Sequence, residues 1–223
     1  MKLCAYCGKS ASTRDHIPPK SLFPKPRPKN LITVPSCFDF NSQFQKDDDY
    51  FWLNLSIRQE NAKNDAACEA ASRAIKNLSR PKAAGFQRSF LASLSNVAVH
   101  SPGGLYLGDR LAYQIEFARL NRIATRITKG MFCRLRNVPL AKGYVASARA
   151  VEGFSESAFS DLKAMLGHVS GESVHKVSSV FSYRSRFLEE DPNFSLWLFT
   201  IYDTTSFVGL TLLESDSQWD ESF

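Results

Sequence analysis

The middle of the chain carries its apolar residues at helical spacing. An Ala-rich stretch predicts a helix over Gln59–Leu78, and a second helix is expected over Phe86–Ser95. A longer helix is predicted over Asp109–Leu135, because Asp109 suits an N-cap and apolar residues then recur every three or four positions. Val97–Leu107, which contains a Pro-Gly-Gly turn, is expected to form two short extended arms.

The last third of the chain is rich in β-branched and aromatic residues, which favour strands. Extended segments are predicted over Val174–Phe187, Ser195–Tyr202 and Phe207–Leu213. A short helix over Glu156–Leu166, capped by Ser155, is expected before them, and the tail Ser215–Phe223 is expected to fray. A small antiparallel sheet packed on the helices follows from this pattern, so the predicted fold class is α+β.

The first fifty residues lack any long periodic segment, since six prolines interrupt them. Leu31–Val34 predicts a short strand, and two short helices are expected from Asn41 onward, with Asp47-Asp48-Asp49 at an acidic helix start. Two regions are therefore expected. Residues 1–57 form a small loop-rich module, and residues 58–223 form a helical part followed by the antiparallel sheet.

The net charge of +6 divides unevenly between these regions. Residues 1–57 carry a net charge of +3, residues 58–142 carry +10 and residues 143–223 carry −7. A polyanion is expected along the basic middle segment, unless its charges only solvate a helix surface. The acidic end could cover an active site, mimic DNA or dock on a partner subunit.

The sequence predicts a cytoplasmic protein without a membrane partner. No segment approaches the roughly 18 consecutive apolar residues of a membrane span, and no apolar run precedes the first cysteine as a signal peptide would. The five cysteines are then expected to be metal ligands or buried thiols rather than disulfides.

Asp15-His16 is the dipeptide with the clearest chemistry. Adjacent residues on an extended backbone point to opposite sides, so one can hold a hard divalent cation while the other takes a proton from water. Hydrolysis of a phosphodiester needs both functions. Taken alone, the pair is weak evidence, because most Asp-His pairs are structural or lie on the surface.

The motifs around this dipeptide resemble the HNH endonuclease family of ββα-metal nucleases, over about residues 4–45. The family pattern is a Cys-x-x-Cys knuckle, Asp-His followed by Ile or Val, any residue and Pro, an Asn-Leu strand, and a second Cys-x-x-Cys followed by Asn. This chain has, in that order, Cys4-x-x-Cys7, Asp15-His16-Ile17-Pro18, Asn30-Leu31 and Cys37-x-x-Phe40-Asn41. The resemblance implies an N-terminal ββα-metal module.

The resemblance also implies roles for individual residues. His16 would be the general base, oriented by Asn30. Asp15 and Asn41 would hold Mg²⁺ or a similar divalent ion, and cleavage would leave a 5′-phosphate and a 3′-hydroxyl. Arg14 is either a phosphate clamp or a plain surface charge.

A structural zinc site is implied by the cysteines, but it lacks a fourth ligand. Cys4, Cys7 and Cys37 fit such a site, and Phe40 stands at the fourth position. Another residue could complete the site, the candidates being Asp39, Cys68 and Cys133. Alternatively, zinc is held by three thiolates and water, or it is lost and Phe40 fills the space as core.

The expected function is metal-dependent hydrolysis of phosphodiester bonds, and the expected substrate is DNA. Arg119, Arg122 and Arg126 on the basic helix are expected to add phosphate contacts. By family analogy, the protein would act as a homodimer or beside a regulatory subunit, in a bacterial defence system. One rival is a zinc-knuckle nucleic-acid-binding or interaction module without catalysis, which would not need Asp15-His16, and another is a decayed HNH remnant.

Overall fold

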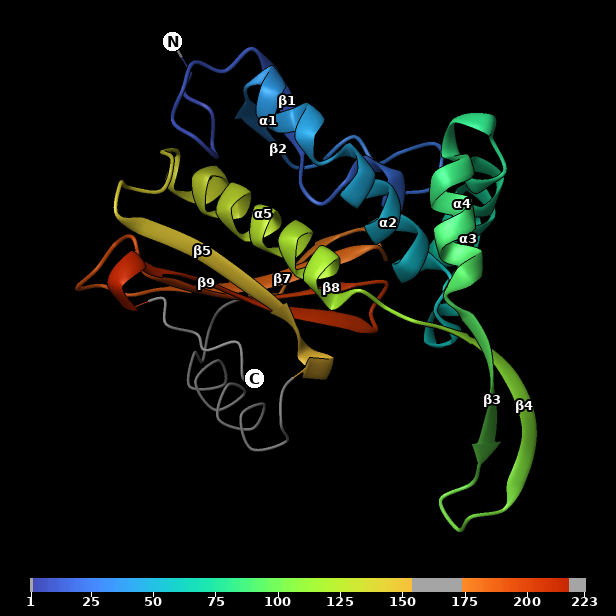
Figure 1. The fold of residues 1–223 in the computed structure, drawn as a ribbon. Coiled ribbons are helices and arrows are strands. Elements are labelled where there is room, and N and C mark those ends of the chain that lie inside the picture. Colours follow the sequence, from blue (N-terminus) through green and yellow to red (C-terminus); the bar gives the residue numbers. More distant parts are fainter. Residues whose placement is uncertain (1, 154–173, 217–223) are drawn as a thin grey trace.

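The computed structural model describes residues 2–153 and 174–216 and confirms the α+β class. Near the N-terminus, β1 (Thr13–His16) and β2 (Thr33–Ser36) pair as antiparallel strands, and α1 (Phe38–Gln43) follows directly. The short α1 leads into α2 (Gln45–Ser56), so the two helices predicted from Asn41 onward are present, but the first begins three residues earlier than predicted. Figure 1 shows β1, β2 and α1 above the C-terminal part of the chain.

Two further helices lie beside α2. The predicted helix over 59–78 is α3 (Asp65–Leu78), which begins later because Asn64 caps it by accepting a hydrogen bond from the backbone amide of Ala67. The helix predicted over 86–95 is α4 (Ala84–Ala92). Short 3₁₀ turns over 59–61 and 81–83 precede them.

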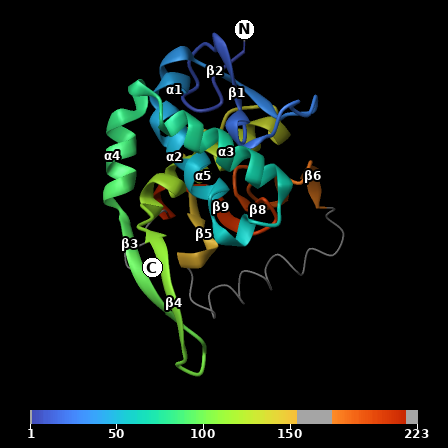
Figure 2. The ribbon, with the colours of Figure 1, turned by 90° about the vertical axis from the view of Figure 1, so that its right-hand side faces the viewer.

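A β-hairpin extends away from the other elements (Figures 1 and 2). It consists of β3 (Leu94–His100) and β4 (Tyr106–Tyr113), paired antiparallel. The predicted helix start at Asp109 is therefore wrong, because Asp109 pairs with Ala98 inside this hairpin. The helix is α5 (Phe117–Arg136), which begins eight residues later than predicted.

The C-terminal sheet has five antiparallel strands in the order β5-β9-β8-β7-β6. They are β5 (Tyr144–Ala150), β6 (His175–Val177), β7 (Phe181–Phe187), β8 (Ser195–Ile201) and β9 (Thr205–Leu213). The segment predicted over 174–187 divides into two strands at a turn in which Ser178 has a φ of 59°. The helix predicted over 156–166 and the tail from 217 lie outside the described residues.

Helix α5 lies between the N-terminal strands and the five-stranded sheet (Figure 1). One hydrophobic core runs from Cys4 and Ile17 near the N-terminus through α2 and α5 to Trp197 and Phe207 of the sheet. In the part of the chain that the structure covers, no helix is long and apolar enough to cross a membrane. The N-terminal segment therefore shares its core with the C-terminal sheet, and α5 connects them.

The contact of α5 with the sheet requires a glycine on β9. Thr128 is fully buried on α5, and a Cβ added at Gly209 would overlap its hydroxyl and lie 2.9 Å from its Cγ2. We expect Gly209→Ala to lower the free energy of unfolding by about 1–3 kcal/mol through overpacking, as measured by denaturant titration.

Gly85→Ala is the matched control, because nothing lies within 4 Å of a Cβ at this helical position. This variant should be neutral or more stable by up to about 1 kcal/mol. Equal stability of wild-type protein and Gly209→Ala would contradict the packing described here.

Candidate active site

The two faces of strand β1 differ in solvent exposure at the predicted catalytic dipeptide Asp15-His16. Asp15 is 6% exposed, whereas His16 is half-buried and Arg14 is exposed. His16 lies opposite Thr33 in the hairpin register, at the last position of β1. Because side chains alternate along a strand, Arg14 and His16 share one face, while Thr13 and Asp15 share the other.

The carboxylate of Asp15 has one hydrogen-bond donor and one ion-pair partner inside the protein. The Tyr6 hydroxyl donates a hydrogen bond of 2.6 Å to its Oδ2, and Nε of Arg126 lies 3.4 Å from the same oxygen. Arg126, whose side chain is 2% exposed, also donates from Nη2 to Asp48 at 2.7 Å. Burial raises the pKa of Asp48 to about 6, although the Arg126 charge opposes this shift.

The predicted metal ligands Asp15 and Asn41 lie on the same side of the hairpin. Asn41 on α1 directs its Nδ2 toward the Thr13 hydroxyl at 3.5 Å, and Thr13 shares its strand face with Asp15. In the described chain, neither Oδ1 of Asp15 nor Oδ1 of Asn41 accepts a hydrogen bond. Two free oxygen donors on one face fit a hard divalent cation such as Mg²⁺.

His16 lies in basic surroundings on the other face. Its partial burial, and then the charge of nearby Lys20, lower its pKa below the ordinary value, although Asp15 opposes this shift. The imidazole is therefore neutral at neutral pH, which a general base requires. Asn30 is exposed in the turn before β2 and has no hydrogen bond to His16 among the described residues, so its orienting role stays a prediction.

The sulfur atoms of Cys4, Cys7 and Cys37 lie within 4.8 Å of one another and could hold a metal ion such as zinc. Cys7 and Cys37 are 3.7 Å apart. Burial opposes ionisation of Cys4, but hydrogen bonds from neighbouring backbone amides outweigh it and lower the pKa of this thiol. Cys4 thus favours the thiolate, the form that binds zinc, whereas burial raises the pKa of the Cys7 thiol.

No fourth His, Cys or carboxylate joins this cluster within residues 2–153 and 174–216. Phe40 stacks on Tyr6 instead, with ring centroids 4.3 Å apart and planes 8° from parallel. Cys68 is exposed on α3, where its thiol bonds to the Ala62 carbonyl. Cys133 is buried on α5, and burial, followed by the nearby Cys4, raises its pKa.

The three arginines predicted to bind phosphate have partners within the protein. Arg119 and Arg122 both pair with Asp47, at 2.8 and 3.0 Å. Arg126 is buried between Asp48 and Asp15. Phosphate contacts by these side chains stay a prediction, and they would have to compete with these ion pairs.

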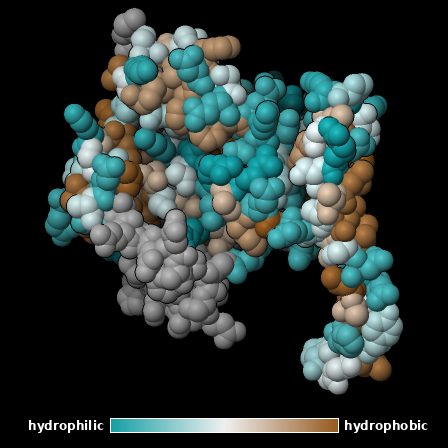
Figure 3. Space-filling view, viewed as in Figure 1, coloured by the Kyte–Doolittle hydropathy of each residue, from teal (hydrophilic) through white to brown (hydrophobic). Residues whose placement is uncertain are grey.

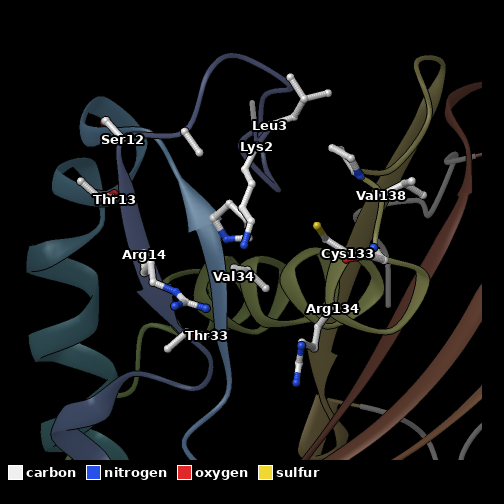
Figure 4. A pocket seen from close by; sticks show the side chains of 14 residues that line it. Lys2, Leu3, Ser12, Thr13, Arg14, Thr33, Val34, Cys133, Arg134 and Val138 are labelled. Carbon is white, nitrogen blue, oxygen red and sulfur yellow. The ribbon is translucent and has the colours of Figure 1, made fainter.

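A basic groove that the sequence did not reveal lies beside Arg14 of β1. A cavity of about 630 Å³ is lined by Lys2, Arg14 and Arg134, and no carboxylate lines it. Figure 4 shows Lys2 and Arg14 beside the two strands and Arg134 across from them on α5. Arg134 also lines a second cavity of about 470 Å³, together with Lys176. We call these two cavities, which share Arg134, the basic groove.

The cations that line the groove are free to pair with an anionic ligand. Lys2, Arg14, Arg134 and Lys176 have no carboxylate partner in the described part of the chain. They come from the N-terminus, β1, α5 and β6, which are distant in sequence, so only the folded chain brings them together. The net charge of the middle segment indicated basicity but not this location.

Comparisons with family models, with curated proteins and with solved structures found no match to this chain. The residues themselves therefore carry the functional argument.

The cysteine cluster predicts measurable zinc binding. The purified full-length protein should contain zinc close to one equivalent per chain by elemental analysis, and Cys7→Ser should lose most of it, because serine is a poor zinc ligand. Cys68→Ser is the control and should retain the metal, since Cys68 lies outside the cluster. Zinc content unchanged in Cys7→Ser would exclude this site.

Proposed function

We propose that this chain is a metal-dependent endonuclease of HNH type that hydrolyses phosphodiester bonds of DNA. The observation that carries the proposal is the arrangement of β1, β2 and α1 around Asp15-His16. Arg14, which shares a strand face with His16, lines the basic groove, while oxygen atoms of Asp15 and Asn41 lie toward the opposite strand face. These strands and α1 are the ββα unit that the motif order predicts.

His16 performs the proton transfer in this proposal. Its neutral imidazole accepts a proton from a water molecule, which attacks the phosphorus of a backbone phosphate. The attack leaves a 5′-phosphate and a 3′-hydroxyl. A divalent ion held by Asp15 and Asn41 would neutralise phosphate charge and stabilise the leaving oxygen. Asp15 and His16 are the last two residues of β1, so a phosphate at the strand end is within reach of both faces.

The basic groove supplies the substrate contacts. Arg14 lies two residues before His16 on the same strand face, and Lys2 and Arg134 line the same cavity as Arg14. Lysine and arginine neutralise backbone phosphates without reading base sequence. Sequence preference would then come from another part of the chain, from a second copy or from a regulatory subunit.

The environment of Asp15 favours a second candidate function. Its carboxylate already has the Tyr6 hydroxyl and the Arg126 guanidinium beside it. A carboxylate satisfied within the protein is what a nucleic-acid-binding module without catalysis would show. Such a module would use the same basic groove and the same cysteine cluster.

Plasmid cleavage separates these two functions. With Mg²⁺ or Mn²⁺, the wild-type protein should nick or linearise supercoiled DNA, and EDTA should stop the reaction. His16→Ala should lower the rate by at least about 100-fold, the lower end of what general base catalysis contributes. His100→Ala, at an exposed histidine on the hairpin, is the control and should cleave normally. DNA binding without cleavage would favour the binding module.

The groove also predicts how DNA affinity depends on salt. In a His16→Ala background, Arg134→Gln combined with Lys176→Gln should weaken DNA binding several-fold. It should also reduce the slope of log affinity against log salt by about 0.9 for each phosphate that the protein no longer neutralises. Arg88→Gln, at an exposed arginine on α4, should change neither quantity. Identical salt slopes in all variants would place the DNA elsewhere.

A further inference from the structure

A third cavity, of about 540 Å³, lies between α1, α5 and β5. Its charged lining residues are all cations, namely Arg122, Arg126, Lys129 and Arg149. The aromatic rings of Tyr6, Phe40 and Phe44 form another part of its wall. Figure 3 shows hydrophilic side chains gathered on the molecule between the N-terminal segment and the sheet. We call this space the α5–β5 cavity.

Arg126 brings unmet hydrogen-bonding capacity to this cavity. Its side chain is 2% exposed, and only Nη2 has a hydrogen-bond partner, Asp48. Its Nε and Nη1 are buried and have no hydrogen-bond partner in the described chain, although Nε is near Asp15. A buried charged donor without a partner is costly, and such a group in a folded protein calls for an acceptor.

Two uncharged polar residues of the cavity are already hydrogen-bonded to the backbone of β5. Thr125 accepts a hydrogen bond from the Ala148 amide, and Asn121 accepts one from the Ala150 amide, both at 3.0 Å. These bonds give hydrogen-bond partners to two backbone amides of the edge strand β5 and attach this strand to α5. Recognition in the cavity is therefore left to the cations and the aromatic rings.

This combination indicates the chemistry of the occupant. Nη1 of Arg126, which has neither a hydrogen bond nor an ion pair in the described chain, is a donor for a phosphate oxygen, and Lys129 on the next turn of α5 adds a second positive charge. The Tyr6–Phe40 stack and the Phe44 ring, which has the Arg126 guanidinium 5.0 Å from its centroid, provide flat apolar surface. Such surface suits a planar base.

We propose that the α5–β5 cavity binds a free nucleotide, with its phosphate on Arg126 and Lys129 and its base against the aromatic wall. The cavity differs from the basic groove in every lining residue. The ligand is therefore a small molecule bound at a site separate from the substrate groove.

Occupation of this cavity would also affect the proposed catalytic centre, a step that rests on the proposed function. Arg126 is the ion-pair partner of Asp15, so a phosphate that attracts Arg126 weakens its hold on that carboxylate. Asp15 would then be more available to a metal ion. By linkage, the nucleotide and the metal would each increase the affinity for the other.

The test is calorimetric titration of the full chain carrying His16→Ala, without metal, so that its outcome does not depend on catalysis. ADP is the probe, with pyrophosphate and adenosine as its two halves. ADP should bind more tightly than either half, and Lys129→Gln should weaken ADP binding about ten-fold. Arg134→Gln, which lies in the basic groove, should leave it unchanged.

Several results would overturn the proposal. They are no ADP binding at millimolar concentration, equal binding to wild-type and Lys129→Gln proteins, or equal affinity for pyrophosphate and ADP, which would indicate a plain anion site. Binding of a DNA oligonucleotide that is abolished in Lys129→Gln, without any ADP binding, would make this cavity part of the substrate path instead. Lys129 is only partly buried and has no ion pair among the described residues, so its replacement should leave the fold intact.

Discussion

The packing of α5 against α2 and β1 depends on the ion pairs of one buried side chain, Arg126. It reaches from α5 to Asp48 on α2 and to Asp15 on β1, and so joins three segments that are distant in sequence. A charge removed from water must have partners, and loss of one partner of a buried pair costs about 3–5 kcal/mol. The pairing also directs Asp15 inward, away from the side of β1 that carries Arg14 and the half-buried His16.

The same guanidinium separates two chemically different sides of the N-terminal segment. On one side of β1, Arg14 lines a groove whose cations have no acidic partners in the described residues. On the other side, Tyr6, Asp15 and Arg126 adjoin the α5–β5 cavity. The basic groove and the α5–β5 cavity therefore have no lining residue in common, and Arg126 connects the α5–β5 cavity to Asp15 on β1.

The sequence predicted the features that depend on local pattern and missed those that depend on distant partners. The α+β class, most helices and the strands rich in β-branched and aromatic residues followed from propensity. Tyr144–Ala150 was missed because its three alanines and one serine do not favour a strand, and its pairing with β9 stabilises the extended conformation. Asp109 resembled an N-cap, yet pairing with β3 places it in a hairpin.

The candidate site shows the same division. The spacing of the cysteines anticipated a cluster that could hold a metal, since it is encoded within a short stretch. Arg126 was predicted to lie on a phosphate-binding surface, but it is three residues after Ile123 and next to Ile127, both fully buried, and therefore faces inward. Apart from Glu116, which pairs with Arg119 at 3.6 Å, the acidic partners of these arginines lie more than seventy residues earlier, and no local pattern connects them.

The most direct test of this account is a double-mutant cycle between Asp15 and Arg126, measured as free energy of unfolding. The wild-type protein, Asp15→Asn, Arg126→Met and the double variant are compared in denaturant. If Arg126 fixes β1 through Asp15, the two substitutions should be non-additive by at least about 1 kcal/mol, as for residues in one buried network. Additivity within about 0.5 kcal/mol would show that the two side chains do not act together, and would contradict the account.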